Sequence, residues 1–187
     1  ADTTRSAPSV GVKTTFEGID MPAVTAYREG IVAKKFKGLE GLIKARGVTV
    51  VAGEGHLTAA NSVTVGDDTY VGTDIILATG SYSRTLPGLE IGGRVITSDH
   101  ALELAEVPAR VIVLGGGVIG VEFASVWKSF GAEVTIVEAL PHLVPNEDEA
   151  VSKTLERAFR RRGIKYTLGV RFQSVTQSAD GVTVTLE

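Results

Sequence analysis

The sequence contains no cysteine among its 187 residues. A chain without thiols forms no disulfide of its own and offers neither a cysteine nucleophile nor a cysteine ligand for a metal. From the residue types alone we therefore assign no metal site and no catalytic residue to this chain.

Long apolar runs and a large excess of one charge are also missing. No segment approaches the length of a membrane span, no signal-peptide pattern opens the chain, and the net charge is only −3. Such a balance gives no reason to expect nucleic acid or a membrane as partner. With 43% hydrophobic and 22% charged residues, the composition is ordinary for a globular α/β protein, which we expect to be cytoplasmic.

What the sequence does contain is a glycine-rich turn between a strand and a helix. The pattern predicts an apolar strand over Arg110–Leu114, the run Gly-Gly-Gly-Val-Ile-Gly at residues 115–120, and a helix over Val118–Phe130. Gly131 follows as the expected end of that helix. The alternative, a glycine-rich hairpin, would need an alternating strand pattern after the turn, and none is present. The arrangement is therefore typical of a dinucleotide-binding turn.

Each motif glycine has a physical role in holding a pyrophosphate. Gly115 allows the tight turn, Gly117 lets the pyrophosphate approach the backbone, and Gly120 lets the helix lie close on the strand. Free N–H groups and the helix dipole then favour negative charge at the helix N-terminus. The predicted nucleotide-binding turn comprises Gly115, Gly116, Gly117, Val118, Ile119 and Gly120.

An acidic residue closes the next predicted strand, Glu133–Glu138. Glu138 lies about twenty residues beyond the turn, where a carboxylate accepts hydrogen bonds from the adenosine ribose hydroxyls. The same charge repels a 2′-phosphate, and no arginine follows at residues 139–142. Arg160–Arg162 ends the following helix at the opposite edge of the sheet, where it complements the helix dipole. We therefore predict NAD rather than NADP.

Hydrophobic periodicity and turn residues predict the remaining elements. Helices are expected at residues 20–46 (capped by Asp20), 101–105 (capped by Ser98 or Asp99) and 147–162 (capped by Asn146), after a flexible lead-in at residues 1–10. Strands are expected at residues 48–51, 56–60, 63–65, 69–71, 74–78 (fully buried), 164–176 and 182–187. The fold class is therefore α/β, with a Rossmann-like parallel sheet and an antiparallel meander.

Three segments closely resemble the flavoprotein disulfide reductases, and within that family the dihydrolipoamide dehydrogenase branch. They are residues 73–81, which end in Ala-Thr-Gly-Ser, residues 111–124 with the glycine turn, and residues 134–148 after it. Residues 23–44 are similar to the same branch. The resemblance covers residues 11–187, nearly the whole chain.

The resemblance implies sites for two cofactors. The implied FAD contacts are Gly55, near the adenine, and Ala78, Thr79, Gly80 and Ser81. The implied NAD contacts are residues 115–120, Glu138, Phe172 at the adenine, and Glu122 near the nicotinamide. Without the family, Glu122 is simply a polar residue near the start of a helix, where the dipole favours it.

Parts of that family's machinery have no match here. The family passes electrons from a dithiol through a paired-cysteine disulfide and FAD to NAD, and this chain has no cysteine. An N-terminal FAD fingerprint and the family's catalytic His–Glu pair are also lacking. His56, His100 and His142 are expected to be surface or capping residues. We therefore expect an internal piece of a longer protein, incompetent as an enzyme by itself.

By the resemblance, residues 1–107 form part of an FAD-binding domain, and residues 108–187 form an NAD-binding domain without its last strand. The parent would be a homodimer that oxidises dihydrolipoamide to lipoamide with NAD. Its partner would be a lipoamide-bearing 2-oxo-acid dehydrogenase complex. Two alternatives stay open: another oxidoreductase of the family, or a noncatalytic NAD-binding or assembly module.

Overall fold

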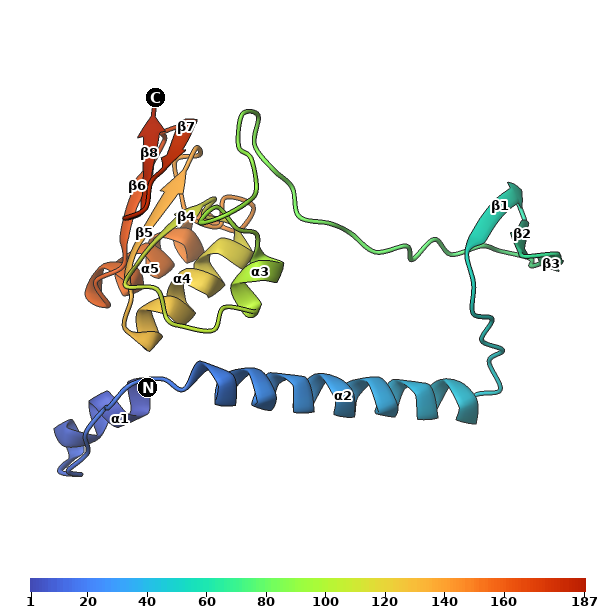
Figure 1. Ribbon diagram of the computed structural model, residues 1–187, viewed down its shortest axis with the longest axis horizontal. Coiled ribbons are helices and arrows are strands. Elements are labelled where there is room, and N and C mark those ends of the chain that lie inside the picture. The colour runs from blue at the N-terminus through green and yellow to red at the C-terminus, as the bar shows by residue number, and fades with distance from the viewer. The chain divides into compact units, whose positions relative to one another are not determined.

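The computed structural model describes residues 1–187, which fall into two compact units. One unit comprises residues 27–82, and the other comprises residues 1–26 together with residues 83–187. Figure 1 traces the helices and strands of both units along the chain. The predicted division into cofactor domains at residue 107 stays a prediction.

A parallel sheet of three strands lies in the larger unit. Strands β4 (Arg110–Leu114), β5 (Glu133–Glu138) and β6 (Lys165–Leu168) are hydrogen-bonded in the order β4-β5-β6. The carboxyl ends of β4 and β5 lie side by side, with Leu114 opposite Val137. The bounds of β4 and β5 are those that the sequence predicts. Both segments are short runs rich in β-branched residues, a composition that favours parallel strands.

Helix α4 (Val118–Phe130) begins within the glycine turn, as predicted. It ends at Gly131, whose φ of 115° lies in the left-handed region that favours glycine. The amide of Gly131 donates to the carbonyl oxygens of Trp127 and Lys128, which closes the last turn of the helix. The sequence therefore predicted both ends of this helix correctly.

Helix α5 (Glu149–Arg161) precedes β6 in the chain. Its N-cap is Asp148, whose side chain accepts a hydrogen bond from the amide of Ala150 at 2.8 Å. The predicted cap, Asn146, is wrong. Two acceptable cap residues precede this helix, and only the backbone conformation decides which of them reaches a first-turn amide.

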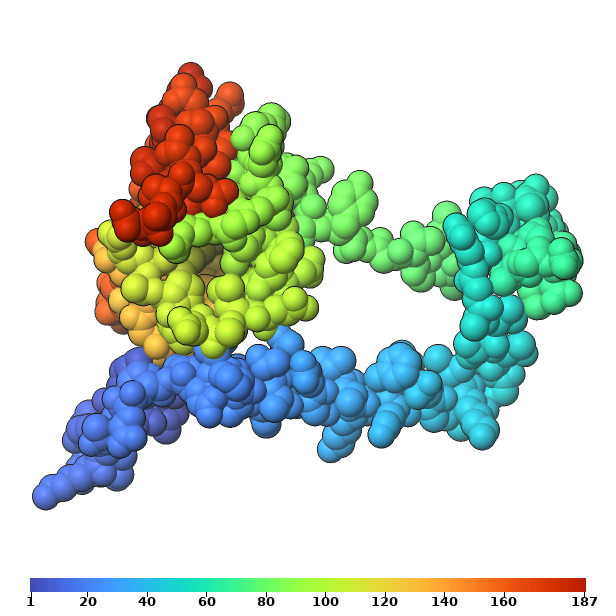
Figure 2. All heavy atoms as spheres, in the orientation of Figure 1, coloured from blue at the N-terminus to red at the C-terminus, as the bar shows by residue number.

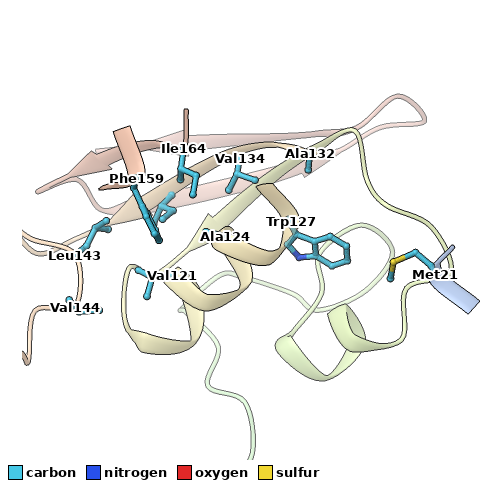
Figure 3. Packing of buried hydrophobic residues seen from close by; sticks show 11 residues of the cluster. Met21, Val121, Ala124, Trp127, Ala132, Val134, Leu143, Val144, Phe159 and Ile164 are labelled. Carbon is cyan, nitrogen blue, oxygen red and sulfur yellow. The ribbon is translucent and has the colours of Figure 1, made fainter. Parts of the chain in front are cut away.

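The hydrophobic core of this unit lies between the sheet and these two helices (Figure 3). Strand β5 contributes Val134 and Ile136, both with no exposed surface. Helix α4 contributes Ala124 and Trp127, and α5 contributes Phe159. Burial of such side chains is worth about 25 cal/mol per Å² of apolar surface, and it holds α4 against β4 and β5.

After β6 the chain forms an antiparallel hairpin of β7 (Phe172–Gln177) and β8 (Val182–Leu186). The predicted single strand over residues 164–176 is wrong. Gly169 has a φ of 69°, a conformation that interrupts a strand, so the segment divides into β6 and β7. The predicted turn at residues 179–181 joins β7 to β8 as expected.

Residues 1–10 are ordered, and the predicted flexible lead-in is wrong. They form α1 (Asp2–Ser6) and the short 3-10 helix η1 (Ala7–Val10). The Asp2 carboxylate accepts a hydrogen bond from Ser129 Oγ at 2.6 Å, and this bond lowers the pKa of Asp2. A contact with α4 that is distant in the sequence therefore fixes this segment.

Helix α3 (Ser98–Leu102) has a different cap from the one predicted. Thr97 occupies the N-cap, and its hydroxyl lies 2.8 Å from Nδ1 of His100. The predicted caps Ser98 and Asp99 lie inside the helix instead. The interpretation of His100 as a capping residue is confirmed, because its ring completes a reciprocal capping box with Thr97.

Helix α2 (Met21–Ala45) leads into the second unit, which holds a meander of β1 (Gly55–Ala59), β2 (Ser62–Val65) and β3 (Asp68–Val71). The strands pair antiparallel in the order β1-β2-β3, as predicted. Asp20 caps α2 by accepting a first-turn amide at 3.0 Å, which also confirms the prediction. No helix of the structure is both long enough and apolar enough to cross a membrane.

Two predicted strands do not form. Residues 48–51 and 74–78 are irregular. The segment predicted to be fully buried leaves Ile76 89% exposed and Leu77 71% exposed. In Figure 2 the green run of spheres near residue 80 is bare on the side that the view shows. A parallel strand needs neighbours that satisfy its backbone N–H and C=O groups. No strand of residues 1–187 pairs with either segment, so their β-branched composition alone does not make them strands.

Candidate nucleotide-binding site

The glycine turn lies at the carboxyl edge of the parallel sheet and is hydrogen-bonded to the end of the neighbouring strand, β5. Gly115 has a φ of 106°, and its amide donates to the carbonyl oxygen of Val137 at 2.8 Å. The amide of Gly116 donates to Oε2 of Glu138 at 2.6 Å. The carbonyl of Gly116 accepts from the amide of Val144 at 2.7 Å. Both sides of the turn are therefore fixed by hydrogen bonds.

The three motif glycines meet the conditions that the sequence predicts for them. The positive φ of Gly115 favours a residue without Cβ. A Cβ on Gly120 would lie well under 3.0 Å from the carbonyl oxygen of Gly115, so α4 approaches β4 as closely as glycine allows. A Cβ on Gly117 would meet no protein atom within 4 Å, which leaves space beside the backbone for a ligand.

Gly116 is also sterically required, a role that the sequence reasoning did not identify. A Cβ on Gly116 would lie 2.7 Å from Cδ2 of Leu143 and 3.2 Å from Cβ of Glu138. The middle glycine of the row is a signal for such close packing, because the usual fingerprint leaves the residue type at this position open. The neighbour that demands it, however, is 27 residues away in the sequence and is found only in the structure.

The first turn of α4 offers backbone amides to an anion. The N-cap is Gly117, which has no side chain to cap the helix. Val118 and Ile119 follow with 55% and 61% of their surfaces exposed. First-turn amides have no partner within a helix, and the helix dipole adds partial positive charge there. The amide end of α4 therefore fits a pyrophosphate.

Glu138 is the buried acid of the site, with 8% of its surface exposed. Oε2 accepts the amide of Gly116, and Oε1 accepts the amide of Leu140 at 2.7 Å. A carboxylate oxygen accepts more than one hydrogen bond, so each can still accept a ribose hydroxyl. The turn, the helix end and Glu138 therefore have the arrangement and the chemistry of a dinucleotide site.

The side chains of the other two predicted NAD contacts, Glu122 and Phe172, make no hydrogen bond to the glycine turn. Glu122 is exposed on α4, and Phe172 is half-buried at the start of β7. Arg162 lies at the far end of α5, where it donates to Ser125 Oγ at 2.6 Å. That location agrees with the prediction that Arg160–Arg162 lies away from the nucleotide.

The predicted FAD contacts lie in the unit of residues 27–82. Gly55 begins β1, and residues 78–81 form an exposed segment outside any strand. None of the buried polar residues, Glu138, Ser152 and Glu156, belongs to this unit. The contact of these residues with FAD stays a prediction.

A glycine turn between a parallel strand and a helix, followed by a strand that ends in a buried acid, defines a dinucleotide-binding α/β protein. The family model described as pyridine nucleotide-disulphide oxidoreductase matches residues 4–187. The chain therefore belongs to this family.

Within the family, relatives named dihydrolipoyl dehydrogenase are similar to this chain. The mitochondrial dihydrolipoyl dehydrogenase 1 of Arabidopsis thaliana is 39% identical over 183 residues, which are 95% of this chain and 36% of the relative. The dihydrolipoyl dehydrogenase of Chlamydia pneumoniae is 35% identical over 185 residues, which are 97% of this chain and 40% of the relative. The chain thus spans well under half the length of these relatives.

A solved structure supports the same assignment. The crystal structure of LpdA from Mycobacterium tuberculosis matches with a TM-score of 0.78 and 31% sequence identity. The match covers 97% of this chain and 41% of that one. The resemblance stated from the sequence is therefore confirmed: the fold is that of a flavoprotein disulfide reductase, and the relatives include dihydrolipoyl dehydrogenases.

Proposed function

We propose that this chain binds NAD at the glycine turn. The observation that carries the proposal is the buried carboxylate of Glu138, which is fastened to the amide of Gly116 beside the open amide end of α4. The turn holds the pyrophosphate, and the Glu138 carboxylate accepts hydrogen bonds from the hydroxyls of the adenosine ribose. When bound, NAD supplies a nicotinamide ring that accepts a hydride. Glu122 and Phe172 are proposed to contact the nicotinamide and adenine ends.

We further propose that the whole protein is a dihydrolipoyl dehydrogenase-like flavoprotein. It would convert dihydrolipoamide and NAD⁺ to lipoamide, NADH and a proton, as a homodimer that serves a lipoamide-bearing 2-oxo-acid dehydrogenase complex. The names of the relatives and the family match support this reading. In it, residues 1–107 contribute part of the FAD domain and residues 108–187 most of the NAD domain.

The choice between NAD and NADP is tested by isothermal titration of the protein with each nucleotide. We expect NAD to bind at least about tenfold more tightly, because a 2′-phosphate would approach the Glu138 carboxylate and no arginine lies at residues 139–142 to compensate. Tighter binding of NADP would contradict the assignment.

The 187-residue chain is expected not to reduce NAD⁺ with dihydrolipoamide. It has no cysteine to exchange electrons with the dithiol. The measurement is NADH absorbance at 340 nm after addition of dihydrolipoamide and NAD⁺, with a complete dihydrolipoyl dehydrogenase as the positive control. Turnover that survives removal of contaminating enzyme would contradict this expectation, whereas NAD binding without turnover agrees with it.

A further inference from the structure

The loop between β5 and α5 packs directly under the glycine turn. Leu143 has no exposed surface, and its Cδ2 lies where a side chain on Gly116 would have to go. The next residue, Val144, donates its amide to the carbonyl of Gly116 at 2.7 Å. Two consecutive residues of this loop therefore fix the position and the orientation of the Gly116 peptide group.

The loop is in turn held by two buried polar residues on the inner face of α5. Oε1 of Glu156 accepts the amide of Leu143 at 3.1 Å, and the residue is only 8% exposed. Ser152 is 1% exposed, and its Oγ lies 3.4 Å from the carbonyl oxygen of Val144. Glu156 also faces Nδ1 of His142 at 3.4 Å.

Val144 shows why the loop needs this support. It is the one residue other than glycine with a positive φ, at 46°, and it is β-branched. Such a conformation is strained in a β-branched residue and persists only where neighbouring contacts enforce it. The bond from Leu143 to Glu156 immediately precedes the strained residue, so Glu156 is placed to maintain it.

We propose that Glu156 is a positioning residue for the nucleotide site. Its carboxylate acts as a hydrogen-bond acceptor that holds Leu143 and Val144 against Gly116, and so holds the amides of the turn in the geometry that binds a pyrophosphate. The proposal rests on the proposed NAD site. In this proposal, the hydrogen bond that Glu156 accepts from Leu143 maintains the turn, and the negative charge of Glu156 is not required for it.

A pair of variants separates the bond from the charge. Glu156→Gln keeps an acceptor oxygen at the same reach and removes the charge, whereas Glu156→Asp keeps the charge and shortens the side chain by one methylene. Glu149→Gln is the matched control, because Glu149 also faces His142 from α5 but accepts no amide of the loop. NAD⁺ binding is measured by isothermal titration, and amide hydrogen exchange is followed at Leu143 and Gly116.

We expect Glu156→Asp to bind NAD⁺ about tenfold more weakly, and the amides of Leu143 and Gly116 to exchange faster in this variant. The NAD⁺ affinities of Glu156→Gln and Glu149→Gln should stay within about threefold of that of the unchanged protein. Equal binding by all variants, or weaker binding by Glu156→Gln than by Glu156→Asp, would overturn the proposal. If the unchanged protein binds no NAD⁺, the proposed function fails. The exchange rates then still decide whether Glu156 holds the turn.

Discussion

Replacement of Gly120 by alanine is expected to lower the free energy of unfolding by about 3 kcal/mol. The added methyl would lie well under 3.0 Å from the carbonyl oxygen of Gly115, and a backbone atom between β4 and α4 cannot rotate away. Relief requires α4 to move off the sheet, which loosens the packing of Ala124 and Trp127 in a dense core. Thermal unfolding by circular dichroism should show a midpoint lower by roughly 6–12 °C.

Gly117→Ala is the matched control for this prediction. A Cβ there meets no protein atom within 4 Å, and the φ of −69° suits alanine, so the unfolding midpoint should stay unchanged. The methyl would instead occupy space that the pyrophosphate needs, and NAD should bind at least about tenfold more weakly. Comparable stability of the Gly120→Ala and Gly117→Ala proteins would show that close approach of α4 is not what requires Gly120.

Glu138→Ala is expected to weaken NAD binding about a hundredfold. The carboxylate accepts two backbone amides, those of Gly116 and Leu140, and its loss leaves both without an acceptor beside the ligand. Ribose hydroxyls lose their acceptor at the same time, and the repulsion of a 2′-phosphate disappears. The preference for NAD over NADP should therefore fall to near one, as measured by isothermal titration with both nucleotides.

Glu133→Gln provides the control on the same strand. Glu133 lies at the other end of β5, is exposed, and pairs with Lys165, which lowers the pKa of the Glu133 carboxyl. Neutralising it removes a carboxylate of the same strand without touching the turn, so affinity for NAD and the preference over NADP should both be retained. A Glu138→Ala protein that binds NAD as well as Glu133→Gln does would remove Glu138 from the site.

The elements around the glycine turn could be predicted to the residue. Strand β4, helix α4 and strand β5 have the predicted bounds, because their start and stop signals are local: a β-branched run, a helical apolar period and Gly131 at the helix end. Residues 48–51 and 74–78 carry an equally good strand pattern, yet they form no strand. Strand pairing depends on a neighbour, and that information is not in the segment itself.

The supports of the site could not be predicted in the same way. Glu138 was predicted because its distance from the turn is characteristic of the nucleotide fold. Leu143, Val144 and Glu156 carry no such spacing, and the segment that contains the first two reads only as a loop. Their roles depend on a side chain that enters the space left by Gly116 and on an amide that meets a carboxylate of α5.

By itself, the sequence predicted the class of ligand, because glycine spacing and a following acid reflect backbone geometry and charge that act over short stretches of chain. It also determined the strand–helix–strand unit that carries them. Only the tertiary structure decided why Gly116 must be glycine, which residue caps α5, and how Glu156 reaches the turn through Leu143. Those features arise where segments far apart in the chain are packed to contact, and packing distances are set by the whole fold rather than by any one segment.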